Sequence, residues 1–195
     1  MVSSDALRDA LGLSKPVASG EPRQLFIDDD AAGGIEVLPA SQAAWCMRQM
    51  DEIERFAARH ELPNGAGWSD IYVRPPAPLT IADLGIPLLP AVEALGRELP
   101  RIEEVITGSL TAPQVVQRAR AFGPSLLTAI VLYGDGSAPH VKWIELTLRG
   151  GAAEVLALLA ATTALPSPEP LMVVDWERAV MARIDEHDAV ERFAR

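Results

Sequence analysis

The amino-acid sequence predicts an α+β domain with a mixed, mostly antiparallel sheet flanked by helices. Two observations favour this fold class, and the composition is that of a globular protein. Short apolar runs that are typical of strands alternate with stretches of helical spacing, and some neighbouring runs are joined by short turns. Apolar residues make up 49% of the 195 residues and charged residues 23%, which is the balance of a globular protein. We expect residues 1–22 to form a short helix and a loose N-terminal arm, and residues 23–195 to form a single α+β domain.

The first part of the sequence predicts two strands, a long helix and a third strand. The apolar runs 24–27 and 35–38 flank an acidic stretch and two glycines, so we expect them to pair as a hairpin. Apolar residues then recur at helical spacing over 41–60, with charged residues mostly on the other side. The run 71–73 predicts a strand that is stopped by two prolines.

The middle of the sequence predicts two helices and three strands. Helical spacing covers 90–99, where a proline suits the first turn, and a strand follows over 102–107. An apolar stripe predicts a second helix over 111–122, which ends at a glycine. The near-continuous apolar run 126–133 is typical of a strand buried on both faces, and it predicts a hairpin with 140–148.

The last part of the sequence predicts a helix, a strand and a final helix. Two glycines precede a helix over 152–162, and a proline-rich link leads to a strand over 171–174. Asp175 then has the position of an N-cap for a helix that runs to about 193.

Net charge restricts the classes of partner. The chain carries 27 acidic and 17 basic side chains, so its formal net charge is −10. A protein of that sign repels nucleic-acid phosphates and anionic membranes, and we expect it to bind neither. It attracts basic proteins, and its charge speeds the encounter.

Cysteine usage and the first residues predict a cytoplasmic protein. Cys46 is the single cysteine, so the chain cannot form an intramolecular disulfide or a site built from several thiolates. The first 13 residues carry charged side chains and lack the apolar core of a signal peptide.

Motifs for catalysis and cofactor binding are missing from the sequence. It contains no GxGxxG, GxxxxGK[ST] or GxSxG pattern, and its three histidines are far apart. We therefore expect no cofactor and no metal, and the sequence leans away from an enzyme.

Three features are candidates for contact with a partner. An acidic run lies between the first two predicted strands, a tryptophan lies on a glycine-rich loop, and a second acidic cluster lies in the predicted last helix. Carboxylates there would pair with the partner's arginines and lysines, and the indole would fill a pocket and exclude water. The candidate partner-binding residues are Asp28, Asp29, Asp30, Trp68, Asp185, Glu186 and Asp188.

These features support one leading hypothesis and leave two alternatives open. The leading hypothesis is a non-catalytic acidic protein that neutralises a basic partner, for example a bacterial immunity protein that inhibits a toxin enzyme. The first alternative is a small enzyme with a divergent carboxylate site around residues 28–30, with or without the assistance of Mg²⁺. The second alternative is a subunit or adaptor of a larger assembly, or a homodimer.

Overall fold

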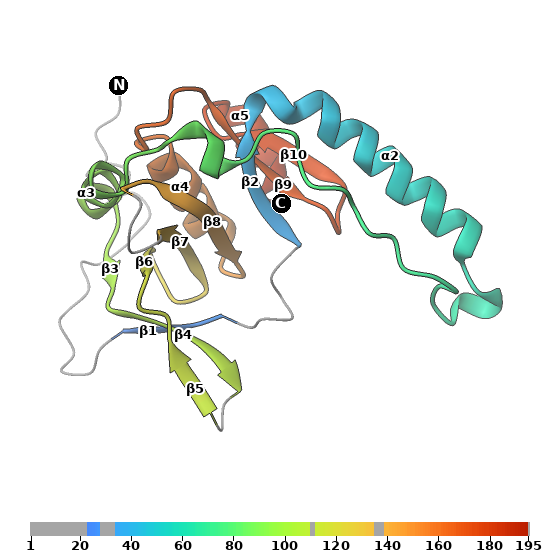
Figure 1. Cartoon of the computed structure of the whole chain (residues 1–195), viewed down its shortest axis with the longest axis horizontal. Coiled ribbons are helices and arrows are strands. Elements are labelled where there is room, and N and C mark those ends of the chain that lie inside the picture. Colours follow the sequence, from blue (N-terminus) through green and yellow to red (C-terminus); the bar gives the residue numbers. More distant parts are fainter. Residues whose placement is uncertain (1–22, 28–33, 110–111, 135–138, 195) are drawn as a thin grey trace.

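The computed structural model describes residues 23–27, 34–109, 112–134 and 139–194 (Figure 1). This part of the chain has an α+β fold with three mostly antiparallel sheets, which confirms the predicted fold class. The predicted N-terminal helix and arm, residues 1–22, lie outside the described residues. The helices are α2 (Ala43–His60), α3 (Leu88–Glu98), α4 (Ala152–Thr162) and α5 (His187–Phe193). The strands are β1 (Gln24–Phe26), β2 (Ile35–Pro39), β3 (Arg101–Ile102), β4 (Glu104–Ser109), β5 (Ala112–Val115), β6 (Ala119–Phe122), β7 (Thr128–Gly134), β8 (Val141–Leu148), β9 (Leu171–Asp175) and β10 (Val180–Arg183).

The four-stranded sheet β3-β6-β7-β8 is the centre of the body, and all of its neighbouring strands are antiparallel. Strand β7 is buried on both faces, as predicted. Ile130 and Leu132 pack into the main core with side chains from α3 and α4, whereas Ala129 and Val131 pack into a second cluster beneath β1 and β4. The predicted hairpin is confirmed, because β7 pairs with β8 along its whole length.

The sheet β10-β9-β2 supports the helix that bears the candidate site. Its central strand β9 also contributes side chains to two apolar clusters, because alternate side chains of a strand point to opposite faces of the sheet. Val173 belongs to the main core, whereas Met172 and Val174 pack with Trp45 and Cys46 of α2. The start of α2 is therefore attached to this sheet by a small apolar cluster of its own.

Two predicted strand arrangements are wrong. The runs 24–27 and 35–38 do not form a hairpin, because β1 pairs in parallel with β4 and β2 pairs antiparallel with β9. These distant pairings bury Leu25 in the second cluster and Val37 in the main core. The run 71–73 belongs to no sheet in the described part of the chain.

Two predicted helices are also wrong, in whole or in part. Residues 111–122 include strands β5 and β6, because pairing with neighbouring strands outweighs a helical stripe in so short a segment. The predicted last helix is divided into β10 and α5. The carboxylate of Asp175 does not cap a helix; it accepts the backbone N–H of Arg178 (2.9 Å) and closes the turn between β9 and β10.

We predict that Gly123→Ala strongly destabilises the fold. A Cβ atom at this position would lie 2.3 Å from the backbone oxygen of Thr128 and 2.8 Å from the Cα of Ala129, so the backbone would have to move. We expect the free energy of unfolding, measured by urea titration, to fall by about 3 kcal/mol.

Gly96→Ala is the matched control for this prediction. In α3 the added Cβ would meet only a ring carbon of Phe122 at 3.6 Å, so the helix should gain up to about 1 kcal/mol. Equal effects of the two substitutions would contradict the packing argument.

Candidate functional site

An arm projects from the body of the molecule (Figure 1). It consists of α2 and of residues 61–79, which return along the helix toward the body. The 18 residues of α2 span about 27 Å. All of its buried residues, Trp45, Cys46 and Gln49, lie in its first half. The second half of the helix therefore extends beyond the core, and the returning chain packs along it.

At the base of the arm, Arg74 ties the returning chain to the body. Its guanidinium carbon lies 4.0 Å from the ring centroid of Trp176 and 5.5 Å from that of Trp45. The carboxylate of Glu36 forms an ion pair with Arg74 (2.8 Å) and accepts the indole N–H of Trp176 (2.9 Å). Because these side chains are largely removed from water, the cation–π contacts are stronger than they would be at an exposed site.

In the middle of the arm, Tyr72 packs inward on α2. Its hydroxyl lies 3.0 Å from the side-chain oxygens of both Gln49 and Glu52, and its ring centroid lies 5.4 Å from that of Phe56. Burial, together with the hydrogen bond to the Glu52 carboxylate, raises the pKa of Tyr72. The phenol therefore stays protonated and serves as a hydrogen-bond donor to the helix.

At the tip of the arm, a short backbone bridge holds the chain reversal. Glu61 and Trp68 face each other in an antiparallel bridge, and the backbone N–H of Leu62 donates to the carbonyl of Gly67 (2.8 Å). Gly67 has a φ of 111°, a conformation that side chains with a Cβ rarely adopt. The side chain of Trp68 is left outside, with 63% of the residue exposed.

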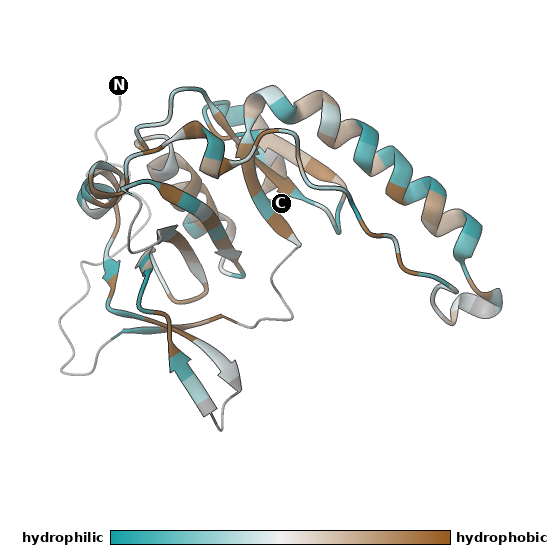
Figure 2. Ribbon diagram, in the orientation of Figure 1, coloured by the Kyte–Doolittle hydropathy of each residue, from teal (hydrophilic) through white to brown (hydrophobic). Residues whose placement is uncertain are grey.

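The outer side of the returning chain is apolar. Ile71 and Val73 are each 83% exposed, whereas Tyr72 and Arg74 between and after them pack inward. In Figure 2 the returning chain is coloured as hydrophobic over part of its length, whereas hydrophobic and hydrophilic residues are mixed along α2. Single exposed apolar residues are ordinary, but several on one projecting segment indicate a contact surface. We call Leu62, Trp68, Ile71 and Val73 the arm surface.

The structure places the predicted site residues in different regions. Trp68 lies in the chain reversal after α2, and Figure 1 shows that this end of the arm is far from α5. Asp28, Asp29 and Asp30 lie outside the described residues. Trp68 is thus part of the arm surface, and the described acidic candidates belong to the body.

The acidic cluster before α5 is partly neutralised within the chain. Arg183 donates two hydrogen bonds to the carboxylate of Asp185 (3.0 and 2.7 Å), which lowers the pKa of Asp185. Glu186 lies 3.3 Å from the same guanidinium. Asp188 is exposed in the first turn of α5. A partner's cation would have to compete with Arg183 for two of these three carboxylates.

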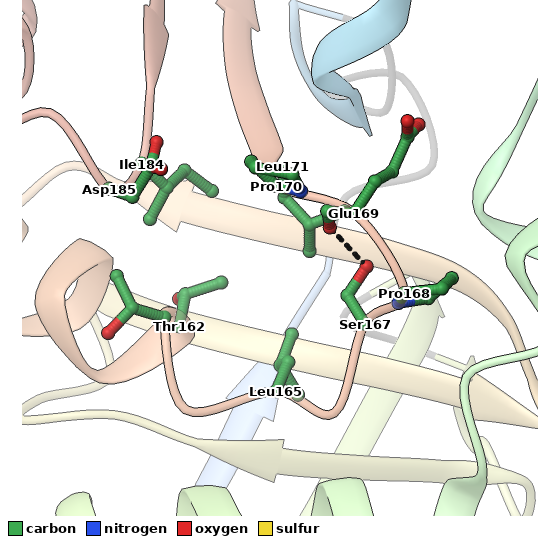
Figure 3. A pocket seen from close by; sticks show the side chains of 10 residues that line it. Thr162, Leu165, Ser167, Pro168, Glu169, Pro170, Leu171, Ile184 and Asp185 are labelled. Carbon is green, nitrogen blue, oxygen red and sulfur yellow. Dashed lines mark hydrogen bonds between the residues drawn. The ribbon is translucent and has the colours of Figure 1, made fainter.

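A hollow of about 310 Å³ lies between the end of α4 and β9, next to Asp185 (Figure 3). Its polar side chains are engaged elsewhere. The hydroxyl of Ser167 donates to the carbonyl of Glu169 (2.6 Å) and that of Thr162 to the carbonyl of Leu158 (2.9 Å). The Glu169 carboxylate points away and accepts the hydroxyl of Ser41 (2.9 Å). These side chains do not converge as a nucleophile, a base and an orienting group would.

Cys46 has the environment of a packing residue. It is fully buried between α2 and the sheet that supports it, and burial, with a contribution from the charge of Glu36, raises its pKa to about 11. Thiolates are the reactive form, so this thiol is inert at neutral pH. Among the described residues, no group of three histidine, cysteine or acidic side chains could hold a metal ion.

The sequence offered Trp68 as a candidate contact residue, and the structure shows that it is exposed, but the sequence did not predict the rest of the arm. The run 71–73 was interpreted as a strand in a sheet, although its two apolar residues face solvent. The available signal was the sequence Ile-Tyr-Val-Arg followed by two prolines, which alternates in hydropathy and ends abruptly. A lone strand of this kind has only one face to bury, and α2 covers that face.

We predict that Arg74→Ala destabilises the arm. The substitution removes two cation–π contacts and leaves the largely buried Glu36 without its cation, which should lower the free energy of unfolding by about 2 kcal/mol. The measurement is a urea titration in which unfolding is monitored by tryptophan fluorescence. Arg55→Ala is the control, because Arg55 is exposed and its side chain, among the described residues, donates to a carbonyl of its own helix. A loss of the same size in both variants would argue against the Arg74 cluster.

We also predict that Cys46 makes the stability fall at alkaline pH. The unfolded thiol ionises near its ordinary pKa of 9.0, whereas the folded thiol stays protonated up to about pH 11. Between these values the unfolded state binds fewer protons, so the free energy of unfolding decreases as pH rises. Urea titrations from pH 8 to 11 should show a steeper decrease for the wild type than for Cys46→Ala. Parallel curves would contradict the prediction.

No protein-family model, no curated protein and no solved structure matches the chain. In the described part of the chain, none of the helices combines the length and the apolar character needed to cross a membrane. What the chain does must therefore be inferred from its own surface, and the arm is the feature of that surface with the clearest chemistry.

Proposed function

We propose that the chain is a non-catalytic binding protein that takes up a basic protein partner, with the arm as its apolar contact. The observation that carries this proposal is the position of Trp68. It is exposed at the tip of an arm that extends beyond the core, and a backbone bridge holds it there. Tryptophans are over-represented among residues that dominate binding energy, because they bury a large area with little loss of conformational freedom.

Charge supports the choice of a basic partner, and its distribution gives the arm and the body different roles. Residues 43–79, which form the arm, carry five acidic and four basic side chains, so the arm is nearly neutral. Residues 169–194 of the body carry seven acidic and three basic side chains. The body would therefore steer a cationic partner toward the molecule, and the arm surface would exclude water from the final contact.

An immunity protein is one concrete form of this function. Such a protein occupies a toxin enzyme in the bacterial cytoplasm, and a projecting arm suits insertion into a concave site. A chain without disulfides is compatible with that reducing compartment. The partner's arginines and lysines would meet the body, and its apolar pocket would receive the indole of Trp68.

A photo-crosslinking experiment tests the proposal. Benzoylphenylalanine replaces Ala66, which is exposed beside Trp68, and the protein is irradiated in a lysate of its source cells. We expect an adduct with a basic protein that becomes weaker at raised salt, since salt screens exposed charge pairs. With the isolated partner, Trp68→Ala should weaken binding about 30-fold and leave the melting temperature unchanged.

Leu89 provides the matched control position. It is 74% exposed on α3, away from the arm, so the same crosslinker there should give no such adduct. Equal adducts from both positions, or full binding by Trp68→Ala, would contradict the role of the arm.

A further inference from the structure

Residues 70–74 form a straight, extended segment along α2. Ser69 donates its backbone N–H to the carbonyl of His60 (2.8 Å), and Arg74 reaches the ring of Trp45. His60 and Trp45 are 15 positions apart on the helix, or about 22 Å. Five residues of chain cover at most about 18 Å, and the arginine side chain supplies the remainder. The segment must therefore be extended as a strand is.

The backbone of this segment lacks the hydrogen bonds of a strand. Among the described residues, the N–H groups of Asp70, Tyr72 and Arg74 have no partner. The N–H of Ile71 points to the opposite edge of the segment and donates to the carboxylate of Asp70 (2.8 Å). Ile71 and Val73 are each 83% exposed, so no other described part of the chain covers the outer face of the segment. An extended edge with open backbone groups is a template for strand pairing.

We propose that a second copy of this chain occupies the segment, by antiparallel pairing about a two-fold axis at Tyr72. In this register Tyr72 faces its own copy, Ile71 faces Val73 of the other molecule, and Asp70 faces Arg74. The open groups of residues 70, 72 and 74 then bond to one another, two for each opposed pair. The contact is isologous, because the same residues contribute from both molecules.

The side chains of the segment are complementary to themselves in this register. Two Ile71–Val73 contacts join four β-branched side chains at positions where no hydrogen bonds intervene and side chains come closest. The opposed Asp70 and Arg74 carry opposite charges, and the side chain of Arg74 keeps part of its surface exposed beside Glu36. An opposed pair of like charges would have disfavoured a second copy.

The proposed pairing is short, so the dimer should be transient. Two segments of five residues bury less than the ~1,200 Å² at which stable interfaces begin. The pairing would occupy Ile71 and Val73 of the arm surface and so compete there with a partner, but it does not depend on the proposed function. Trp68 lies outside the paired residues, and the experiment needs no partner protein.

Sedimentation equilibrium of the full chain, from about 10 µM to about 1 mM, tests the pairing. We expect a concentration-dependent dimer in the wild type. In Ile71→Lys/Val73→Lys the introduced ammonium groups oppose each other, so dimerisation should weaken at least about tenfold. Ile71→Glu/Val73→Glu should behave in the same way. Both positions are highly exposed, so the melting temperature should not change.

Mixing the two double variants is the decisive step. Opposite charges then face each other, and a mixed dimer should form although neither variant dimerises alone. Leu89→Lys is the control, since Leu89 is similarly exposed on α3 and should leave dimerisation intact. The proposal is overturned if the wild type stays monomeric, if the double variants dimerise like the wild type, or if mixing restores nothing.

Discussion

The guanidinium of Arg74 lies against two indole rings and one carboxylate, and the course of the arm depends on this contact. Apart from Trp45, Cys46 and Gln49, the residues of α2 are not buried, so the helix is attached to the body only through its first half. The returning chain is held by Arg74 at the base, Tyr72 in the middle and the backbone bridge at the tip. Polar and aromatic contacts thus stabilise a projection that an apolar core does not reach.

The two clusters on either side of β9 explain how the body carries this arm. Val173 packs into the main core and Met172 into the cluster with Trp45, so one strand joins the arm to the rest of the fold. Glu36 on the neighbouring strand β2 then aligns Arg74 and Trp176 through one carboxylate oxygen. A protein with this construction can present side chains outward without loosening its core, because the core and the arm share a rigid strand rather than a loop.

The helices and strands that could be predicted are those whose burial pattern lies within one short stretch of sequence. The apolar run of β7 predicted a strand buried on both faces, and the spacing over α2 and α4 predicted helices close to their observed bounds. The prediction of a helix over 111–122 was wrong, because β6 buries side chains on both faces: Ala119 and Ala121 pack into the second cluster and Phe122 into the main core. Of the residues of the arm, Trp68 was a candidate because of its glycine-rich loop, while Arg74 and Tyr72 were not, since their partners are 16 or more positions away in the chain.

By itself, the sequence determined the α+β class, the acidic net charge and the single cysteine, because these follow from composition and local spacing. Tertiary structure decided which strands pair and what the run 71–73 becomes. β1 pairs with β4 and β2 with β9 across long stretches of chain, and residues 71–73 lie on α2 instead of in a sheet. Which strands pair depends on how much apolar area the whole sheet can bury, and no local sequence pattern specifies that area.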